Sequence, residues 1–482
     1  MTFGAPRRAA ATFALCCVGL AVVYADQNLM APHLTAIARD LRLTSRERDS
    51  KLGGEIAFAF FLLGAPCAVA VGALADARSR VKLFAWCLVL GSAPNVFALW
   101  IVSYDQLFWL RALTGIAVGG AAPLTYSLCG DLFPPSERTR VSAATGVSMS
   151  FGIVLGQAIS GFVGTKYGWR APFVVVALPG IVTALMMMFY AEEPERGGME
   201  EEYVATGESF EEEGGAQARE RSERENLVES PGRTHGSTPP PRGGGRFYGD
   251  VAAFWRKVVG IVTVKTVAMF LAQGISGCVP WSMINTFFND YLAQDKGLGV
   301  PASTTLMITF AAGAMTSTVF SGWYGQRLYN QNAQKVSVFM GSSAILGVAP
   351  AAYLILADYR PGSTADLVGK SSVAFLAGFV SSCVGVNIRA MLLNVLHPLN
   401  RGTAFSFFML TDDLGKGLGP MIVAQFINVL GREKAFLVSV LFWIPCGLIL
   451  LATAFTILGD LKSASSRYKA ERAEISADER LE

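Results

Sequence analysis

The segment Thr411–Pro420 (TDDLGKGLGP) places three charged side chains in a run that is otherwise apolar. At about 1.5 Å per residue, Asp412 lies about 15 Å inside a helix that starts near Arg401, close to the middle of a bilayer core of about 30 Å. A charge at that depth costs about 2.5–3.5 kcal/mol on insertion scales. Asp412, Asp413 and Lys416 therefore need partners or water.

Helical spacing puts these three side chains on one face, because Lys416 follows Asp412 by four residues and Asp413 by three. Two interpretations follow from this arrangement. The trio forms an internal ion pair without a role, or its face lines a polar pathway through a membrane.

The composition indicates an integral membrane protein, since 52% of the 482 residues are hydrophobic and only 16% are charged. The net charge of +3 is small and mixed along the chain, which argues against a nucleic-acid partner. The eight cysteines lie mostly in apolar runs without CxxC spacing, so we interpret them as small buried residues. The sequence predicts no metal site and no cofactor.

Apolar runs of membrane-spanning length are arranged as six, a polar connector, and six more. The runs lie near residues 9–33, 53–75, 81–103, 107–130, 140–164 and 171–191, and then near 257–288, 302–325, 335–357, 371–396, 402–430 and 434–458. We predict a six-helix bundle over 1–191, a disordered cytoplasmic connector over 192–255, a second bundle over 256–461 and a polar cytoplasmic tail over 462–482.

The two halves share a repeat with a shift of 263 residues (401 − 138). It carries Arg138 onto Arg401, and the same shift superposes two glycines, Gly152 and Gly156, onto Gly415 and Gly419. Gly168 and Phe173 fall on Gly431 and Phe436, although chance matching of apolar sequence supplies such pairs. Parallel repeats with a site between them are a design of secondary transporters. We expect the repeated glycines to let helices cross closely where the halves meet.

Between the second and third runs the chain reads GALADARSRVK over residues 72–82. This stretch resembles the cytoplasmic GxLaDrxGrrxxl signature of the major facilitator superfamily, with matches at Gly72, Leu74, Asp76 and Arg80, and with Ser79 in place of the usual glycine. Arg111-Ala-Leu-Thr-Gly115 resembles the fourth-helix RxxqG pattern of the same superfamily, whose Arg is implicated in proton-coupled members. The resemblance implies twelve transmembrane helices in two pseudo-symmetric six-helix bundles.

Within that superfamily the chain is similar to spinster-like transporters. Residues 23–27 (VYADQ) correspond to their first-helix NYMDR, and Asp131-Leu132-Phe133 and Glu137-Arg138-Thr139-Arg140 to their ADLF and QRTR. Gln27 stands where that group has Arg, and Ala121 where it has Glu. The group moves lysophospholipids or sphingolipids with protons implicated, so the resemblance implies lipid transport only weakly.

The candidate residues for substrate binding or proton coupling lie inside the apolar runs. Asp26 and Arg111 fall at similar depth and form a candidate pair. Arg389 is either a headgroup anchor or a substrate contact. The full set is Asp26, Arg111, Arg389, Asp412, Asp413 and Lys416. A conformational latch is assigned to Gly72, Asp76, Arg80, Arg138 and Arg401.

The predicted function is secondary active transport of a small organic or amphipathic solute by alternating access, coupled to protons. The alternatives are an uncoupled lysolipid or sphingolipid facilitator, and a membrane receptor or scaffold that transports nothing. Only three histidines occur, without HExxH spacing, and no GxxxxGK[ST] loop is present, so an enzyme and an ATP-driven pump are both disfavoured.

The expected surroundings are the lipid bilayer, a small-molecule or lysolipid substrate and protons, with the protein as a monomer. We predict a multi-pass protein of the plasma membrane or of an endolysosomal or vacuolar membrane. The signature at residues 72–82 places both termini and the connector in the cytoplasm. Basic residues crowd the first outer loop, against the usual charge rule: Arg39, Arg42, Arg46, Arg48 and Lys51.

Overall fold

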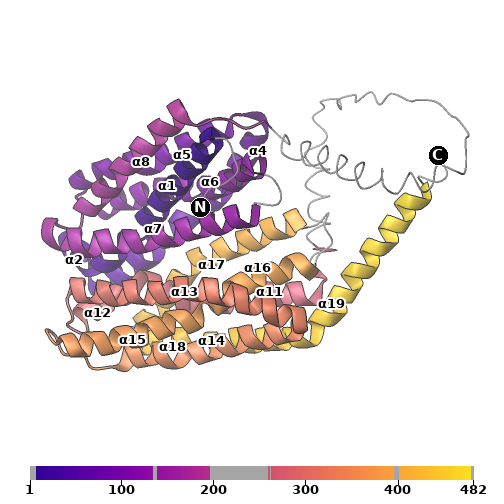
Figure 1. The fold of residues 1–482 in the computed structure, drawn as a ribbon. Coiled ribbons are helices and arrows are strands. Elements are labelled where there is room, and N and C mark those ends of the chain that lie inside the picture. Colours follow the sequence, from indigo (N-terminus) through magenta and orange to yellow (C-terminus); the bar gives the residue numbers. More distant parts are fainter. Residues whose placement is uncertain (1–6, 134–137, 196–258, 261, 396–400, 479–482) are drawn as a thin grey trace, which may run out of the picture.

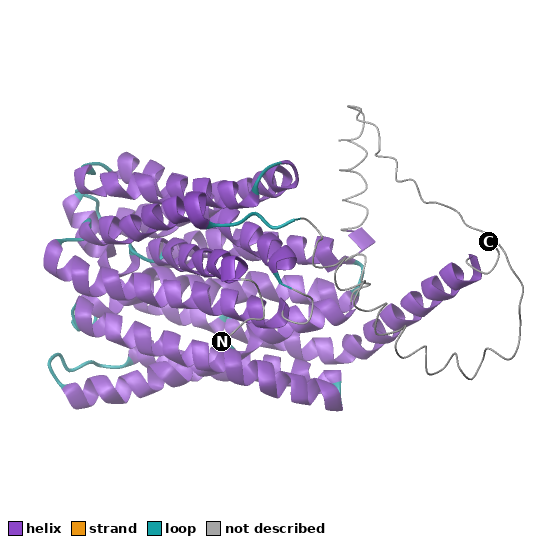
Figure 2. Ribbon diagram, turned by 45° about the horizontal axis from the view of Figure 1, so that its top comes forward, coloured by secondary structure: helices purple, strands orange, loops and turns teal. Residues whose placement is uncertain are grey.

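The structure, a computed structural model, describes residues 7–133, 138–195, 259–260, 262–395 and 401–478, and every regular element in these ranges is helical (Figure 2). The first half contains α1 (Arg7–Gln27), η1 (Ala31–His33), α2 (Leu34–Asp40), α3 (Ser45–Glu47), η2 (Arg48–Glu55), α4 (Ile56–Ala77), α5 (Arg80–Val96), η3 (Phe97–Trp100), α6 (Tyr104–Leu132), α7 (Arg138–Tyr167) and α8 (Ala171–Tyr190). The second half contains α11 (Lys265–Ser282), η4 (Met283–Phe288), α12 (Asn289–Gln294), α13 (Val300–Gln331), α14 (Ala333–Leu356), α15 (Thr364–Ser381), α16 (Cys383–Val395), α17 (Arg401–Leu430), α18 (Arg432–Leu441) and α19 (Trp443–Asp478).

The helix lengths confirm the predicted fold class. Eleven stretches of described helix are long and apolar enough to cross a membrane, and α17 adds the apolar segment Leu414–Leu430. The helices of the two halves lie side by side in Figure 1, with the first half in indigo and magenta above the second half in orange. The arrangement agrees with the predicted two bundles of membrane-spanning helices.

Two predicted boundaries differ from the structure. Most of the expected connector, residues 196–255, lies outside the described residues, but its first residues, 192–195, are described and Glu193 binds the first half. The expected polar tail from Lys462 continues α19 as helix to Asp478, because Lys, Ala, Arg and Glu are good helix formers.

The repeated glycines mostly pack helices of the same half, which corrects the expectation that they lie where the halves meet. A Cβ at Gly156 of α7 would stand 2.1 Å from the carbonyl oxygen of Ala25 in α1. A Cβ at Gly419 of α17 would stand 2.1 Å from Oγ of Ser282 in α11. Gly161, a further glycine of α7, faces the other half at Thr304 of α13. The close approach of α7 to α1 is thus repeated as that of α17 to α11.

Three clusters of buried apolar side chains show where the halves are joined. One cluster contains residues of both halves, such as Leu29 and Leu52 with Phe287 and Val440. The other two clusters each belong to one half, one around Phe84 and Leu128 and one around Phe270, Met340 and Leu392. The shared cluster lies at the end of the molecule that carries α2 and α12, which we call the closed end (Figure 1).

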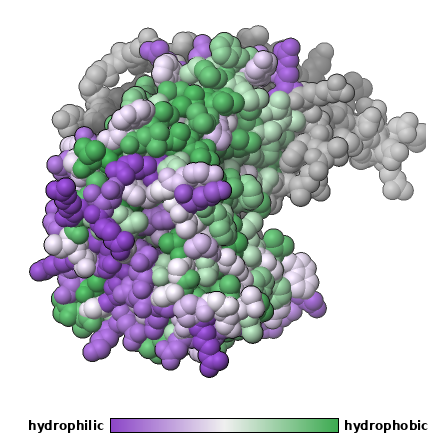
Figure 3. Space-filling model, turned by 90° about the vertical axis from the view of Figure 1, so that its left-hand side faces the viewer, coloured by the Kyte–Doolittle hydropathy of each residue, from purple (hydrophilic) through white to green (hydrophobic). Residues whose placement is uncertain are grey.

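The opposite end carries the loop between α4 and α5 with the predicted signature, and we call it the signature end. Figure 3 looks onto the closed end, where hydrophilic side chains gather over its left and lower part beside hydrophobic areas. Burial of apolar side chains from both halves at the closed end stabilises this contact. Among the described residues, the halves share no such cluster at the signature end.

Candidate functional site

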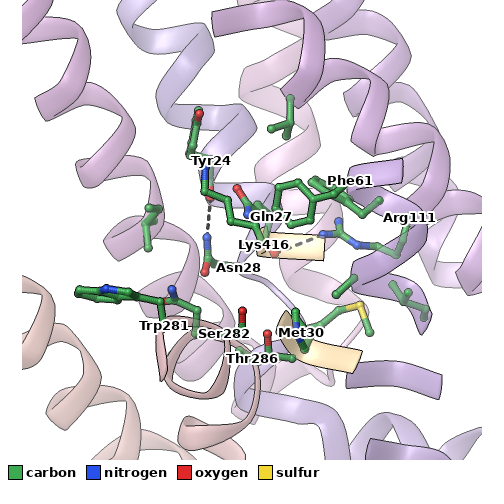
Figure 4. A pocket seen from close by; sticks show the side chains of 18 of the residues that line it. Tyr24, Gln27, Asn28, Met30, Phe61, Arg111, Trp281, Ser282, Thr286 and Lys416 are labelled. Atoms are coloured by element: carbon green, nitrogen blue, oxygen red, sulfur yellow. Dashed lines mark hydrogen bonds between the residues drawn. The ribbon is translucent and has the colours of Figure 1, made fainter. Parts of the chain in front are cut away.

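A cavity of about 320 Å³ lies between the two halves. The first half contributes Arg111 of α6, and the second half contributes Trp281 of α11 with Asp412 and Lys416 of α17. Figure 4 shows Arg111 and Trp281 on opposite sides of the cavity, with Lys416 beside Gln27 between them. A concave site with a few charged groups on a mostly apolar wall suits a small solute.

The structure brings Asp26 and Arg111 together. Arg111 Nη1 donates to both carboxylate oxygens of Asp26, at 3.0 and 2.9 Å, and both residues are almost fully buried. Asn95 Nδ2 donates to Asp26 at 3.0 Å, and Arg111 Nη2 donates to the carbonyl of Gln27 at 3.3 Å. The guanidinium also stacks near the ring of Phe60, 5.1 Å from its centroid. Each charge of this pair stabilises the other, because removing one of them leaves the other buried and uncompensated.

One atom of this pair is unsatisfied. Arg111 Nε is buried and has no hydrogen-bond partner among the described residues. Because Arg111 lines the central cavity while Asp26 lies behind it, the pair connects the cavity to the interior of the first half. A change in the charge of Asp26 therefore changes the charge that the cavity presents.

Two of the three charged side chains of α17, Asp412 and Lys416, face the cavity from the other half. Lys416 Nζ lies 2.8 Å from Oδ2 of Asp412, and both side chains are partly exposed, at 43% and 30%. The side chain of Asp413 lies outside what the structure describes. The ion pair foreseen from the helical spacing is present, and it lines the cavity.

A second cavity of about 230 Å³ lies inside the second half and shares three lining residues with the first: Cys278, Trp281 and Asp412. Arg389 of α16 lines this second cavity and not the first. Asn387, which the sequence places beside Arg389, instead donates to the carbonyl of Ser321 in α13 and so does not accompany it. Arg389 is thus separated from the Asp26–Arg111 pair but close to Asp412.

The latch residue whose contacts are described is Arg80, at the signature end. It pairs with Asp131 at the end of α6 and with Glu193 after α8, where Nε and Oε1 lie 3.0 Å apart. These contacts stay within the first half. The side chains of the other four assigned residues lie outside the described ones: Gly72, Asp76, Arg138 and Arg401.

Glu193 is the carboxylate that organises this corner. Partial burial raises its pKa, but hydrogen bonds from the Ser79 hydroxyl, the Val81 amide and Arg80 outweigh burial and lower the pKa below the ordinary value. The carboxylate therefore stays charged at neutral pH and holds the start of α5 against the end of α8.

An ionic cluster at the closed end was missed by the sequence analysis. Arg432 of α18 binds Asp49 of the first half, with Nη2 and Oδ1 2.6 Å apart, and Asp290 of the second half, with Nη1 and Oδ2 2.9 Å apart. Thr35 of α2 donates its amide and hydroxyl to Asp290, each at 2.8 Å. The cluster therefore ties α2 and η2 of one half to α12 and α18 of the other.

One signal for this cluster was present in the sequence. The basic residues of the first outer loop looked misplaced, and Arg48 among them pairs with Asp49 at 2.8 Å. What the sequence could not supply was the partner, because Asp49 and Arg432 are separated by 383 residues.

A family model described as Major Facilitator Superfamily matches residues 16–420 and again residues 281–478. This chain belongs to the major facilitator superfamily. The superfamily resemblance drawn from residues 72–82 is thereby confirmed.

Several curated relatives are transporters. A putative metabolite transport protein of Haemophilus influenzae is 25% identical over 198 residues, 40% of this chain and 47% of that protein. The vacuolar basic amino acid transporter 2 of Saccharomyces cerevisiae is 28% identical over 104 residues, 22% of this chain and 20% of that protein. These two matches span less than half of the relatives' lengths. The hexuronate transporter of Bacillus subtilis is 19% identical over 86% of this chain and 87% of that protein.

Solved structures share the fold. A bacterial homologue of the human lysosomal transporter Spinster, in an inward-facing and occupied conformation, has a TM-score of 0.71 at 16% identity, over 95% of this chain and 99% of that one. A D-xylose–proton symporter has a TM-score of 0.62 at 14% identity, over 92% of this chain and 96% of that one. The likeness to the spinster-like group thus extends from short motifs to the whole fold.

Proposed function

We propose that this protein is a secondary active transporter that moves a small organic solute by alternating access and couples this movement to protons. The observation that carries the proposal is the central cavity, which both halves line and which the ionic cluster of Arg432 closes at one end. The hexuronate transporter that aligns with most of this chain supports a small metabolite as the solute.

In the proposed rocking step, the closed end opens and the signature end closes. Among the described residues, the shared cluster of buried apolar side chains and the ion pairs between the halves lie at the closed end, so separation there breaks the contacts of Arg432 with Asp49. Contacts of similar strength at the signature end would then replace them. Such exchange needs two arrangements of nearly equal free energy.

Proton coupling is assigned to the carboxylates of Asp26 and Asp412. Each pairs with a cation, Arg111 and Lys416 respectively; the first pair is buried, and the second is partly exposed to the cavity. Protonation of either carboxylate would release its cation to bind a solute or another residue. The two states of each pair thereby link the proton to the substrate.

The test begins with thermal stabilisation of the purified protein by lysolipids, sugars, amino acids and organic anions, because selective binding raises stability. The stabilising compound is then offered to vesicles that contain the protein, with and without an imposed pH gradient. We expect accumulation only with the gradient. Equal flux without a gradient would instead support the uncoupled lipid facilitator, and no flux in either condition would contradict transport.

For the sidedness, we propose that the signature end and the connector face the cytoplasm, with the protein as a monomer in the bilayer. The basis is the signature loop between α4 and α5, near which Arg80 and Glu193 lie. Glycosylation acceptors engineered into residues 196–246 test this topology. Their modification from the lumenal or extracellular side would reverse the assignment.

A further inference from the structure

The second cavity lies where three helices of the second half are interrupted. The path of α11 changes to the π-helical η4 after Ser282, α15 gives way to α16 at Ser382, and α18 gives way to α19 at Phe442. Trp281, Ser382 and Trp443, which adjoin these interruptions, all line the cavity. Interrupted helices in transporters supply binding groups near the middle of the membrane.

Most polar groups of this cavity already have partners inside the protein. Gln273 Nε2 donates to the carbonyl of Phe270 at 3.0 Å, and its Oε1 accepts from Cys446 at 3.2 Å. The Ser381 hydroxyl donates to the carbonyl of Ala377 at 2.7 Å. These groups are therefore not free to bind a ligand strongly.

Two donors remain. The Ser382 hydroxyl oxygen is buried and has no hydrogen-bond partner among the described residues. Arg389 is exposed to the cavity and, within the part of the chain that the structure describes, forms no ion pair. Arg389, which forms no ion pair among the described residues although it lies near Asp412, and the buried Ser382 hydroxyl are donors for an anionic oxygen ligand.

The charges of the lining side chains indicate how many negative charges the bound anion carries. Arg111, Arg389 and Lys416 line the two connected cavities as cations, and Asp412 lines both as an anion. Asp412 pairs with Lys416, and the buried Asp26 neutralises Arg111. Among these described side chains one positive charge is left over, that of Arg389, which matches a monoanion.

The aromatic side chains that line the second cavity favour a ligand with a planar ring. The indoles of Trp281 and Trp443 both line the cavity, with centroids 6.0 Å apart at 69°, and Phe310 packs edge-on to Trp281 at 5.9 Å. Aromatic pairs prefer such edge-to-face and offset geometries, so a planar ring can pack against these faces. A cavity of about 230 Å³ has room for one ring and not for a long acyl chain.

We propose that the second cavity binds an aromatic monocarboxylate, with its carboxylate on Arg389 and Ser382 and its ring against Trp281 and Trp443. This inference deepens the proposed transport function and rests on it for its physiological meaning. The binding step itself requires no transport and is measured separately.

The test compares benzoate with benzamide, which has the same shape and no charge, by calorimetric titration of the purified full-length protein at pH 7. Benzoate is expected to bind about 10- to 100-fold more tightly, the usual effect of a charge-assisted hydrogen bond. Arg389→Gln should remove this preference, whereas Arg389→Lys should keep most of it. Ser382→Ala should weaken benzoate by a smaller factor without changing the affinity for benzamide.

A matched control is Arg327→Gln, which neutralises another exposed arginine of the second half that does not line either cavity. It should leave benzoate binding unchanged. Equal affinities of benzoate and benzamide for the unaltered protein would overturn the proposal. Because the first comparison uses the unaltered protein, it does not depend on how the variants fold.

Vesicle uptake separates this inference from the transport function. Benzoate binding without accumulation under a pH gradient would leave the site in place and contradict coupled transport of its ligand. Accumulation of a sugar or amino acid by a protein that does not bind benzoate would preserve the transport function and overturn the site.

Discussion

Helices α7 and α17 occupy equivalent places in the two halves and are built alike, yet they present different chemistry. Each has 30 residues, and each packs through repeated glycines against the first helix of its own half. The repeat of 263 residues carries Ile153 onto Lys416, and both line the central cavity. Where α7 offers an apolar side chain, α17 offers an ion pair.

This difference shows that the helix and its packing do not require the charges. The first half has Met149 and Ile153 at the positions of Asp412 and Lys416 and forms the same helix. The first half instead places its buried charges on α1 and α6, as Asp26 and Arg111. The two halves therefore present different charges to the cavity although their helices are arranged alike. Because the fold does not require the charges of α17, these charges can serve the function.

The sharpest way to test this asymmetry is Asp412→Asn, with Asp413→Asn beside it. Either change should abolish accumulation of the substrate, because an amide cannot carry a proton between the two sides of the membrane. At least one of the two should retain exchange, since the halves can still rock. Uptake into vesicles with a pH gradient, compared with counterflow without one, measures both properties.

The matching control removes the three charges of α17, so that it is uncharged there like α7, by the triple change Asp412→Asn, Asp413→Asn and Lys416→Met. We expect this protein to fold, because α7 forms the same helix with the uncharged Met149 and Ile153 at the positions of Asp412 and Lys416. If the folded triple variant accumulated substrate at the original rate, the trio would be an ion pair without a role.

The pair of the first half should behave differently from that of α17, because it is buried. Asp26→Asn should lower the free energy of unfolding by about 3–5 kcal/mol and damage transport, since it leaves Arg111 charged without its partner. Arg111→Gln should act in the same way. The double variant should lose much less than the two singles added together, with a coupling energy of roughly 1–3 kcal/mol.

Denaturant unfolding in detergent and vesicle uptake provide the two readouts of this cycle. Additive losses in both would show that Asp26 and Arg111 act independently. Retained insertion into the membrane, checked by surface labelling, separates a functional loss from a failure to assemble.

The turns that follow α7 and α17 offer a third comparison. Gly168 and Gly431 both adopt a left-handed backbone, with φ of 87° and 77°, which glycine accepts without strain. After the first glycine, Arg170 pairs with Asp40 of its own half at 2.5 Å. After the second, Arg432 pairs with Asp49 of the other half. The pair after α7 thus stabilises the first half, whereas the pair after α17 joins the two halves.

Arg432→Gln should therefore open the closed end, whereas Arg170→Gln should not. Spin labels at Arg46→Cys and Lys434→Cys, exposed positions on opposite halves, report the separation by pulsed electron resonance. We expect a second, longer distance in the Arg432 variant alone, because that change leaves Asp290 buried without its cation and removes the contact of Asp49 with the other half. Identical distance distributions in the two variants would mean that the cluster does not hold the halves together.

The sequence predicted the fold well because its evidence was periodic or local. Runs of apolar residues, the glycine spacing and the Gly72–Lys82 motif each lie within a single segment. Asp412 and Lys416 could be paired from the sequence because they are four residues apart on one helix. Asp26 and Arg111 could be paired because helix direction alternates and fixes their depth.

The rest depended on contacts that no local pattern encodes. Arg432 and Asp49 meet only because the two halves dock, and Glu193 looked like the start of a polar connector. The glycines of α7 were assigned to the wrong interface, since a glycine marks close approach without naming the neighbour. The second cavity arises from interruptions of three helices, and single-sequence periodicity does not locate such interruptions.

The smallest expected effect concerns the signature end, where the halves again differ. In the first half Glu193 joins Arg80, whereas Arg327, near the end of α13 in the second half, has no ion pair among the described residues. Because the pKa of Glu193 is lowered by folding, its stabilising contribution is complete above the ordinary carboxyl pKa and is lost as the pH falls through the lowered value.

Glu193→Gln should therefore reduce the melting temperature slightly at pH 7, by an amount equivalent to less than about 1 kcal/mol, as for other partly exposed ion pairs. The difference from the unaltered protein should shrink as the pH is lowered below 4.5, the ordinary value for this carboxyl. Glu192→Gln is the matched control, because that neighbouring side chain makes no described hydrogen bond through its carboxylate. Thermal unfolding of the three proteins from pH 7 to pH 3 measures the effect, and a difference that grew toward acid pH would contradict it, because a protonated Glu193 no longer pairs with Arg80.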